Sequence, residues 1–505
     1  MYNNVLEYLD EVVKKVPNKL AYASETEQVT FQEVYTNSQK VATYLLNKGQ
    51  YKQPIVVFMG KEPKTIISYY GVIATGGYYI PIDTEMPAGR IQLILDNVQA
   101  SVIICDEKTK ELAVEFKTEA EVVLYKEMLS TEIREQELQE IRRNTIDTDP
   151  IYIVFTSGST GIPKGVVGMH RATIDYIENL SEVLGFNEET IFGNQTPLYL
   201  DACFKELYPT LKFGATTYLI PKLLFTQPVK LIEYLNEHKI NTTCWVVSAF
   251  KMISTFKAFN TVVPKYLHTI AFGSEVFPID QFTEWKRVLP NATYTNLYGP
   301  TECTGMSCYY RVNRELDLTD SIPIGIPFKN TEILLLDDNN KVVPKGEQGE
   351  ICIRGTSLTH GYYNNPEKTA ESFIQNPLNT AYPELIYKTG DIGKVNEFGE
   401  LLFVSRKDYQ IKHMGHRIEL GEIEVNTNML DGVDDVACIY DKNKQKIILF
   451  YAGKLEINKL KVELKNKLPR YMVPNVVTEV DKIPLTPNGK VNRMLLQDMY
   501  SNKKK

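Results

Sequence analysis

The stretch "VFTSGSTGIPKGVV", from Val154 to Val167, combines glycines and hydroxyl side chains with a single lysine. The residues before it, "IYIVF", and those after it, "VVGMH", are rich in β-branched and aromatic side chains, which favour strands. A phosphate loop of the NTPase type has Ser or Thr directly after its lysine, whereas Lys164 is followed by Gly165. The sequence therefore predicts strand, polar loop, strand. Such a loop is either a plain turn or a set of N–H and hydroxyl donors for an anion, with Lys164 adding a mobile charge.

Length and composition narrow the class of protein. A chain of 505 residues exceeds one ordinary core, so two or more domains are expected. Its 43% hydrophobic and 24% charged residues are typical of a soluble globular protein. The net charge of −7 argues against nucleic acid or an anionic membrane as partner. Seven cysteines without a CxxC pair indicate buried thiols in a reducing compartment. We find neither a secretory signal nor an apolar run of membrane-spanning length, so we expect a cytoplasmic protein.

The hydrophobic pattern predicts an α/β fold. Strand-like runs at 54–60 and 101–106 flank a helical stretch that ends at Gly76 and Gly77, a β-α-β order typical of a mostly parallel sheet. Residues 107–149 are charged and helical, and we expect them at the periphery. Short strands separated by turns follow at about 322–404, which predicts a small antiparallel β subdomain. These segments make up a predicted large domain over 1–406.

The last hundred residues form a second predicted domain, 407–505. The runs "DVACIYD" and "KIILFYAG" predict a hairpin. They are followed by a helical stretch, "EINKLKVELKNKL", and by a last strand-like run, "VVTEVDKIP". This pattern is typical of a small α+β unit.

Five stretches occur in a fixed order: "FTSGSTGIPKG", "NLYGPTE", "YKTGD", "SRKDYQIKHMGHRIELGEIE" and "PLTPNGKVNR". Together they resemble the adenylate-forming superfamily, which includes acyl-CoA synthetases, luciferases and the adenylation domains of nonribosomal peptide synthetases. The resemblance covers nearly the whole chain. It is greatest to free-standing amino-acid adenylation domains such as D-alanine–carrier protein ligase. It implies a large nucleotide- and substrate-binding domain and a mobile C-terminal lid domain.

The resemblance implies a reaction in two halves, using ATP and Mg²⁺. A carboxylate attacks the α-phosphate of ATP to give an acyl-adenylate and pyrophosphate. A phosphopantetheine thiol then displaces AMP and forms a thioester. Because the chain ends soon after Lys490 with no carrier segment, we expect a separate carrier protein as the acceptor. The alternatives are an acyl- or aryl-CoA ligase and a non-catalytic nucleotide sensor, although a sensor should have lost Lys490 or Glu302.

The resemblance assigns the nucleotide contacts residue by residue. In the second motif, Asn296 would bond the adenine, Tyr298 would stack on it, and Glu302 would hold Mg²⁺, a cation that needs few protein ligands beside phosphate. Gly299 and Thr301 belong to the same motif, and Thr301 would contact the α-phosphate. The opening loop would hold the β- and γ-phosphates through Thr156, Ser157, Gly158, Ser159, Thr160, Gly161 and Lys164.

The later motifs complete this assignment. Asp391 would accept the ribose hydroxyls, as a carboxylate does in dinucleotide sites, and Arg406 would support it. Lys490 would be the catalytic residue that neutralises charge as the two anions approach. Asp408 maps to the hinge of the C-terminal domain, and Gly415 in "KHMGHR" would line the thiol path. Taken alone, each is an ordinary turn residue or exposed side chain.

Asp201, in "PLYLDACFKELYP", occupies the position of the aspartate that pairs with the substrate α-ammonium in amino-acid-activating members of the superfamily. A helix N-cap is the alternative reading of this residue. Leu200 departs from the aromatic residue that is usual there. Lys205 would either pair with an acidic or polar substrate side chain or bend its ammonium toward solvent. A small or medium apolar amino acid, D-alanine included, is the first expectation. The mapped side-chain pocket comprises Ala202, Lys205, Trp245, Ile270, Phe272, Gly273, Leu297, Gly305 and Met306.

Overall fold

The computed structural model describes residues 2–158, 161–317, 320–407, 409–485 and 491–502. These residues divide into two compact units, of which the first contains Met1–Thr84, Val98–Val154 and Gly165–Lys407, and the second contains Glu85–Asn97, Phe155–Lys164 and Asp408–Lys505. The second unit thus includes two segments that the sequence assigns to the large domain. The division into 1–406 and 407–505, and the mobility of the lid, stay predictions. Across the described ranges, no helix is both long and apolar enough to cross a membrane.

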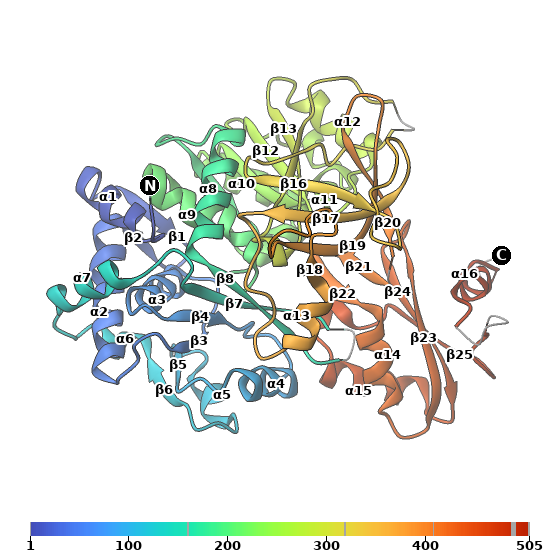
Figure 1. Ribbon diagram of the computed structural model, residues 1–505, viewed down its shortest axis with the longest axis horizontal. Coiled ribbons are helices and arrows are strands. Elements are labelled where there is room, and N and C mark those ends of the chain that lie inside the picture. Colours follow the sequence, from blue (N-terminus) through green and yellow to red (C-terminus); the bar gives the residue numbers. More distant parts are fainter. Residues whose placement is uncertain (1, 159–160, 318–319, 408, 486–490, 503–505) are drawn as a thin grey trace. The chain divides into compact units, whose positions relative to one another are not determined.

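One sheet contains the strands on either side of the opening loop, in the order β6-β5-β3-β4-β7-β8 (Figure 1). Strand β3 pairs in parallel with both β4 and β5, which confirms the predicted β-α-β unit. The helix α3 (Pro63–Ala74) ends before Gly76, whose φ of +71° suits a residue that stops a helix. The strand–loop–strand prediction is also confirmed. The strands are β3 (Pro54–Phe58), β4 (Tyr78–Pro81), β5 (Val102–Cys105), β6 (Glu121–Leu124), β7 (Pro150–Thr156) and β8 (Lys164–Met169).

A second sheet has the order β15-β14-β13-β12-β11-β9-β10-β1-β2. Its central strands pair in parallel and are buried, as strands covered on both faces are. The strands are β1 (Leu20–Ala23), β2 (Gln28–Thr30), β9 (Ile191–Asn194), β10 (Thr216–Leu219), β11 (Thr242–Val246), β12 (Thr269–Gly273), β13 (Thr293–Tyr298), β14 (Cys308–Arg311) and β15 (Ile326–Pro327).

The main hydrophobic core of the first unit joins these two sheets. It takes Val57 and Tyr152 from one sheet and Phe192 and Ala271 from the other, together with side chains of the surrounding helices. Helix α9 is buried along most of its length, because every residue from Phe204 to Leu211 is buried. Most of these helix side chains come from α1 (Glu7–Lys15), α2 (Phe31–Asn47), α3, α8 (His170–Leu184) and α9 (Phe204–Phe213).

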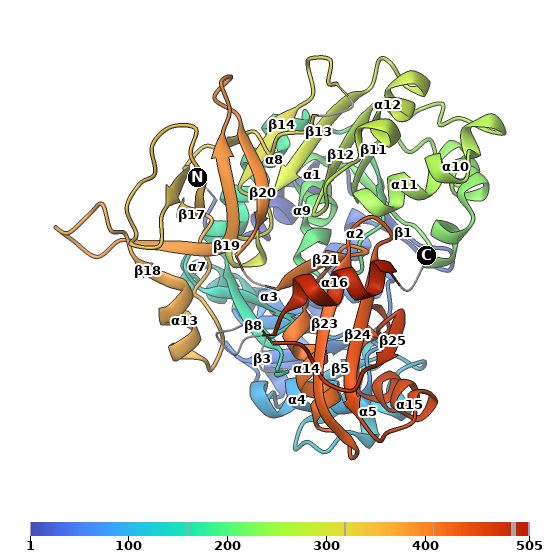
Figure 2. The ribbon, with the colours of Figure 1, turned by 90° about the vertical axis from the view of Figure 1, so that its right-hand side faces the viewer.

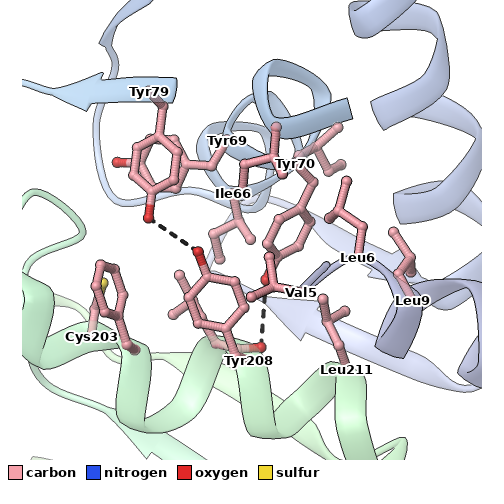
Figure 3. Close-up of a cluster of buried hydrophobic side chains, with 14 of the residues drawn as sticks. Val5, Leu6, Leu9, Ile66, Tyr69, Tyr70, Tyr79, Cys203, Tyr208 and Leu211 are labelled. Atoms are coloured by element: carbon pink, nitrogen blue, oxygen red, sulfur yellow. Dashed lines mark hydrogen bonds between the residues drawn. The ribbon is translucent and has the colours of Figure 1, made fainter. Parts of the chain in front are cut away.

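Tyrosine hydroxyls attach α9 to its neighbours (Figure 3). The hydroxyls of Tyr79 and Tyr208 lie 3.3 Å apart, and the Tyr22 hydroxyl donates to the Leu207 carbonyl oxygen at 2.7 Å. Tyr22 also exchanges a hydrogen bond with Tyr70 at 2.8 Å. Buried phenols carry both a large apolar area and a polar group that requires a partner. The bonds therefore fix the position of α9 relative to β1, α3 and β4.

The predicted antiparallel β subdomain is confirmed as a third sheet, ordered β16-β17-β19-β18 with β20 on β19. All of its pairings are antiparallel. Its elements are β16 (Thr331–Leu336), β17 (Gly349–Gly355), α13 (Pro366–Ser372), β18 (Phe373–Gln375), β19 (Leu385–Val395) and β20 (Leu401–Arg406).

The remaining described helices cover the strands or connect them. They are α4 (Ala88–Val98), α5 (Lys110–Glu115), α6 (Tyr125–Met128), α7 (Glu135–Asn144), η1 (Asp201–Cys203), η2 (Lys222–Thr226), α10 (Pro228–Glu237), α11 (Val247–Thr255), η3 (Ala258–Asn260), α12 (Ile279–Val288), η4 (Thr301–Cys303) and η5 (Arg470–Met472). The segment 107–149 also contains β6, which the charged sequence did not predict.

Residues 409–502 confirm the predicted α+β pattern. A long hairpin of β23 and β24 carries β25 in parallel beside β24. Side chains of α14 and α15 pack on one face of this sheet, and α16 covers the other (Figure 2). The elements are β21 (Gln410–His413), β22 (His416–Glu419), α14 (Leu420–Asn428), β23 (Val433–Asp441), β24 (Lys446–Gly453), α15 (Ile457–Lys467), β25 (Val476–Glu479) and α16 (Arg493–Asn502).

Removing a side chain from the buried helix should weaken the first unit. Leu211 of α9 is 0% exposed, so Leu211→Ala should lower the free energy of unfolding by about 2–5 kcal/mol. The measurement is urea unfolding followed by near-ultraviolet circular dichroism. Leu223→Ala is the matched control, because Leu223 is 67% exposed and its loss should change stability by less than about 0.5 kcal/mol. Equal effects of the two changes would contradict the placement of α9.

Candidate functional site

The residue expected to hold ribose, Asp391, lies in a buried polar group on β19. The Tyr298 hydroxyl donates to its Oδ2 at 2.6 Å, and Arg406 Nη1 lies 2.5 Å from its Oδ1. These three residues come from β13, β19 and β20, so two sheets meet here. Burial and the neighbouring carboxylate raise the pKa of Tyr298 well above its usual value, which keeps the phenol a donor. The predicted support of Asp391 by Arg406 is therefore present as a direct ion pair.

The short helix η4 follows Tyr298 and carries Thr301 and Glu302. Glu302 is fully buried and accepts a hydrogen bond from the Tyr362 hydroxyl at 2.7 Å. Burial raises the pKa of Asp201, while the Thr301 hydroxyl and the Lys205 ammonium lower it and Glu302 raises it further. Asp201 and Glu302, far apart in sequence, are thus close enough to influence each other. Asn296 lies on the same strand as Tyr298, and its side-chain amide donates to the Pro323 carbonyl at 2.8 Å.

The start of α9 places charged groups inside the core. Glu206 is fully buried, and Asn194 Nδ2 donates to its Oε2 at 3.3 Å. Burial raises the pKa of Glu206 to about 8, although Lys205 and Lys61 favour its ionised form. The Lys61 ammonium donates to three backbone carbonyls, of Asn194, Gln195 and Ile220, at 2.9–3.2 Å, and burial lowers its pKa to about 7. The sequence analysis did not select Glu206 or Lys61. For Glu206, the available signal was the adjacent charged pair Lys205 and Glu206 within a mostly apolar helical stretch.

Gly305 faces the same space as Asp201. A Cβ added to Gly305 would lie 3.8 Å from Asp201 Oδ2 and 3.7 Å from the Tyr176 hydroxyl, and the φ of Gly305 is +94°. Tyr176 is buried, and no described residue bonds its hydroxyl. Tyr176, Leu297, Cys203 and Met306 belong to one hydrophobic cluster. The structure therefore brings together the expected substrate residues Asp201, Leu297, Gly305 and Met306, and adds Tyr176.

Three mapped pocket residues lie elsewhere. The side chains of Trp245, Ile270 and Phe272 pack in a separate cluster with Phe250 and Trp285, on the opposite face of the second sheet. Their neighbours Cys244 and Ala271 lie in the cluster that holds Tyr176. The correction has a simple cause, because side chains alternate between the faces of a strand and an offset of one residue exchanges the faces. On the Tyr176 side of the sheet, these two strands present Cys244 and Ala271 instead. Gly273, on the Ala271 face, has no room for a Cβ, which would lie 2.4 Å from the Leu297 carbonyl oxygen.

The opening loop belongs to the second unit. The Ser157 hydroxyl donates to the Arg417 carbonyl at 2.7 Å, and the Gly158 N–H donates to Glu422 Oε2 at 3.2 Å. Glu422 is fully buried and forms an ion pair with Arg90. Lys164 Nζ lies 3.5 Å from Glu419 Oε1, and the Thr156 hydroxyl contacts the Lys164 carbonyl. The loop thus binds a carboxylate through a backbone N–H, as expected of an anion site.

Several other expected residues stand as follows. Ala202 is in η1 beside Asp201, Gly299 directly follows β13, and Gly161 has a φ of +81° in the opening loop. Gly415 follows β21 and also has a positive φ, of +81°. Four positions lie outside the described residues, namely Ser159, Thr160, Asp408 and Lys490.

Within the described ranges, no group of three or more His, Cys, Asp or Glu side chains is placed to hold a metal ion. All seven cysteines are described, buried and free of disulfides.

Comparison with known proteins places the chain among proteins of similar sequence and fold. Gramicidin S synthase 2 of Brevibacillus brevis is 32% identical over 516 residues, which cover 99% of this chain but only 11% of that synthase. Zwittermicin A synthase ZmaJ of Bacillus cereus is 31% identical over 510 residues, covering 98% of this chain and 94% of ZmaJ. The solved Vibrio cholerae adenylation domain AlmE, in complex with glycyl-adenosine-5'-phosphate, has a TM-score of 0.83 at 20% identity, covering 99% of this chain and 98% of AlmE.

The family model described as AMP-binding enzyme matches residues 9–363, well over half of the chain. That range includes the opening loop, η1, α9 and the strand that carries Asn296 and Tyr298. The chain therefore belongs to the AMP-binding enzyme family.

Proposed function

We propose that this protein is an AMP-forming ligase that activates an amino acid as its adenylate, with release of pyrophosphate, and then transfers it as a thioester to the phosphopantetheine of a carrier protein. The observation that carries the proposal is the buried carboxylate of Asp201, beside Thr301 and facing Gly305. A buried carboxylate is best stabilised by a cation, and the α-ammonium of an amino acid supplies one. The fatty or aryl acid that a CoA ligase activates has no ammonium group to place at this position.

The group around Asp391 fits the ribose of ATP. Each Asp391 oxygen already accepts one hydrogen bond, from Tyr298 or Arg406. A carboxylate oxygen can accept a second one, which leaves acceptor capacity for two ribose hydroxyls. Asn296 lies on the strand of Tyr298, where adenine would be bonded. We propose these contacts, with stacking by Tyr298, as the nucleotide site.

Glu302 is the proposed protein ligand of Mg²⁺. Its carboxylate oxygens suit a hard cation that keeps most of its coordination for phosphate and water, and the Tyr362 hydroxyl donates to Oε1. Mg²⁺ would supply charge neutralisation on the phosphates. Glu302 itself would orient the cation from η4, next to Thr301, whose hydroxyl is proposed to contact the α-phosphate.

Lys490 and the opening loop complete the proposed chemistry. The Gly158 N–H already donates to a carboxylate, so it can donate to a phosphate oxygen. Lys490 would place a positive charge at the reacting carboxylate and α-phosphate, where two anions must approach. Asp408 would be the hinge that changes the active site between the two half-reactions. The similarity to the glycyl-adenylate-bound AlmE in fold, and to gramicidin S synthase 2 in sequence, supports this assignment.

Removing the proposed catalytic lysine tests the first half-reaction. Lys490→Ala should reduce amino-acid-dependent ATP–pyrophosphate exchange by roughly 3–4 kcal/mol of transition-state stabilisation. ATP binding, measured with a fluorescent analogue, should stay near normal, and transfer from supplied aminoacyl-adenylate to a separately added carrier protein should survive. Lys482→Ala, at an exposed lysine of the same domain, is the control. Exchange at the wild-type rate in Lys490→Ala would exclude the assigned role.

Asp201 separates amino-acid activation from activation of other acids. Asp201→Ala should weaken amino-acid binding by roughly 2–5 kcal/mol, because the substrate ammonium would be buried without a partner. Des-amino analogues of the substrate should be affected much less. The exposed Asp280→Ala serves as the control. The CoA-ligase alternative would gain if Asp201→Ala handled amino acids normally and the wild-type protein exchanged pyrophosphate with a simple fatty or aryl acid.

A further inference from the structure

Helix α9 contains a largely buried lysine whose ammonium has no hydrogen-bond acceptor among the described residues. Lys205 is 3% exposed. Across the described ranges, no hydrogen bond or ion pair reaches its Nζ, in contrast to the three carbonyls around Lys61. The carboxyl groups of Asp201 and Glu206 lie near enough to act on the charge of Lys205, but among the described residues neither accepts a hydrogen bond from it. A side chain that only needed solvent would extend its ammonium to the surface, as lysines commonly do. Lys205 therefore lies in a position suited to an acceptor from outside the chain.

The groups near Lys205 lie close enough to one another to interact electrostatically. The charge of Lys205 acts on both Asp201 and Glu206, and Glu206 in turn acts on Tyr176 and Cys244. Asp201 and the Tyr176 hydroxyl both face the space above Gly305. We call Tyr176, Asp201, Lys205 and Glu206 the polar cluster. Two of its polar atoms, the Tyr176 hydroxyl and Glu206 Oε1, have no partner among the described residues.

The charge balance of the polar cluster favours one further anion. Asp201 is assigned to the substrate α-ammonium. Burial disfavours the ionised form of Glu206. Any negative charge on Glu206 also interacts with the nearby ammonium of Lys61. A protonated Glu206 is a hydrogen-bond donor. Lys205, Tyr176 and Glu206 then offer one charge and two neutral donors to the same ligand. A carboxylate, which accepts several hydrogen bonds and balances one charge, satisfies all three.

We propose that the amino acid activated here carries a carboxylate on its side chain, and that Lys205 pairs with it while Asp201 pairs with the α-ammonium. This rests on the proposed function and names its substrate class. An amide side chain would accept a hydrogen bond but leave the charge of Lys205 unbalanced. An apolar side chain, the first expectation from sequence, would satisfy none of the three donors. Cys244 and Ala271, on the Tyr176 side of the sheet, have small side chains.

The first test compares matched substrates in ATP–pyrophosphate exchange with the wild-type protein. The panel contains aspartate and glutamate, asparagine and glutamine, alanine, leucine and ornithine, each as the L- and D-isomer. One acidic amino acid should exceed its isosteric amide by at least tenfold in kcat/KM. Equal or faster exchange with the amide, or a preference for an apolar amino acid, would overturn the inference while leaving the proposed function intact. Absence of exchange with every amino acid would instead overturn the proposed function.

The second test changes the residue that reads the side chain. Lys205→Met should reduce kcat/KM for the acidic substrate at least a hundredfold and remove the preference over its amide. Lys205→Glu should shift the preference toward ornithine, a change that a merely structural lysine would not produce. Lys212→Met, on the same helix, should keep the wild-type order of substrates. Melting curves and binding of a fluorescent ATP analogue verify folding. An unchanged acid-to-amide ratio in folded Lys205→Met would overturn the inference, and if both variants misfold the wild-type panel decides alone.

Discussion

The enclosure of α9 between two sheets is the constraint on which the rest of the first unit depends. A helix buried over eight successive residues cannot send a charged side chain to solvent, so each charge near it needs a fixed partner. Lys61 meets this requirement with three carbonyls at the ends of β9 and β10. Glu206 meets it in part through Asn194 and through proton uptake. In the proposed function, the same enclosure would let Asp201 and Lys205 select a substrate by charge.

The position of α9 is fixed by groups that have no chemical role. The tyrosines of β1, α3 and β4 reach its backbone and side chains, and apolar residues of both sheets fill the remaining space. Lys205 therefore starts from a rigid base, since α9 is bonded on several sides, and Asp201 lies in η1 directly before it. Selectivity by a buried ion pair requires such rigidity, because a movable lysine would turn to water and lose discrimination.

The sequence predicted the architecture well where the spacing of hydrophobic residues and the turn residues were clear. The strand–loop–strand around Lys164, the antiparallel subdomain and the hairpin of β23 and β24 were all evident from local patterns. The sequence did not predict β4, which has only four residues directly after a glycine pair. So short a segment does not show whether its hydrophobic residues repeat as in a strand or as in the end of a helix. It also failed at Trp245, Ile270 and Phe272, since a buried parallel strand is apolar on both faces and its pattern does not show which face borders the site. The direction of Lys205 was undetermined because a lysine stem permits both burial and escape.

The carboxylate on the opening loop has a consequence for nucleotide affinity. In the proposed nucleotide site, a phosphate oxygen would be an alternative to Glu422 as the acceptor of the Gly158 N–H, and Glu422 is held by Arg90 within the same unit. A ligand attached to its own site competes at an effective concentration that is often millimolar. Phosphate binding at this N–H is therefore an exchange of one anion for another, and its apparent strength is a difference between two affinities. Any change that displaces α14 from the loop would register as tighter nucleotide binding, without a new contact to the nucleotide.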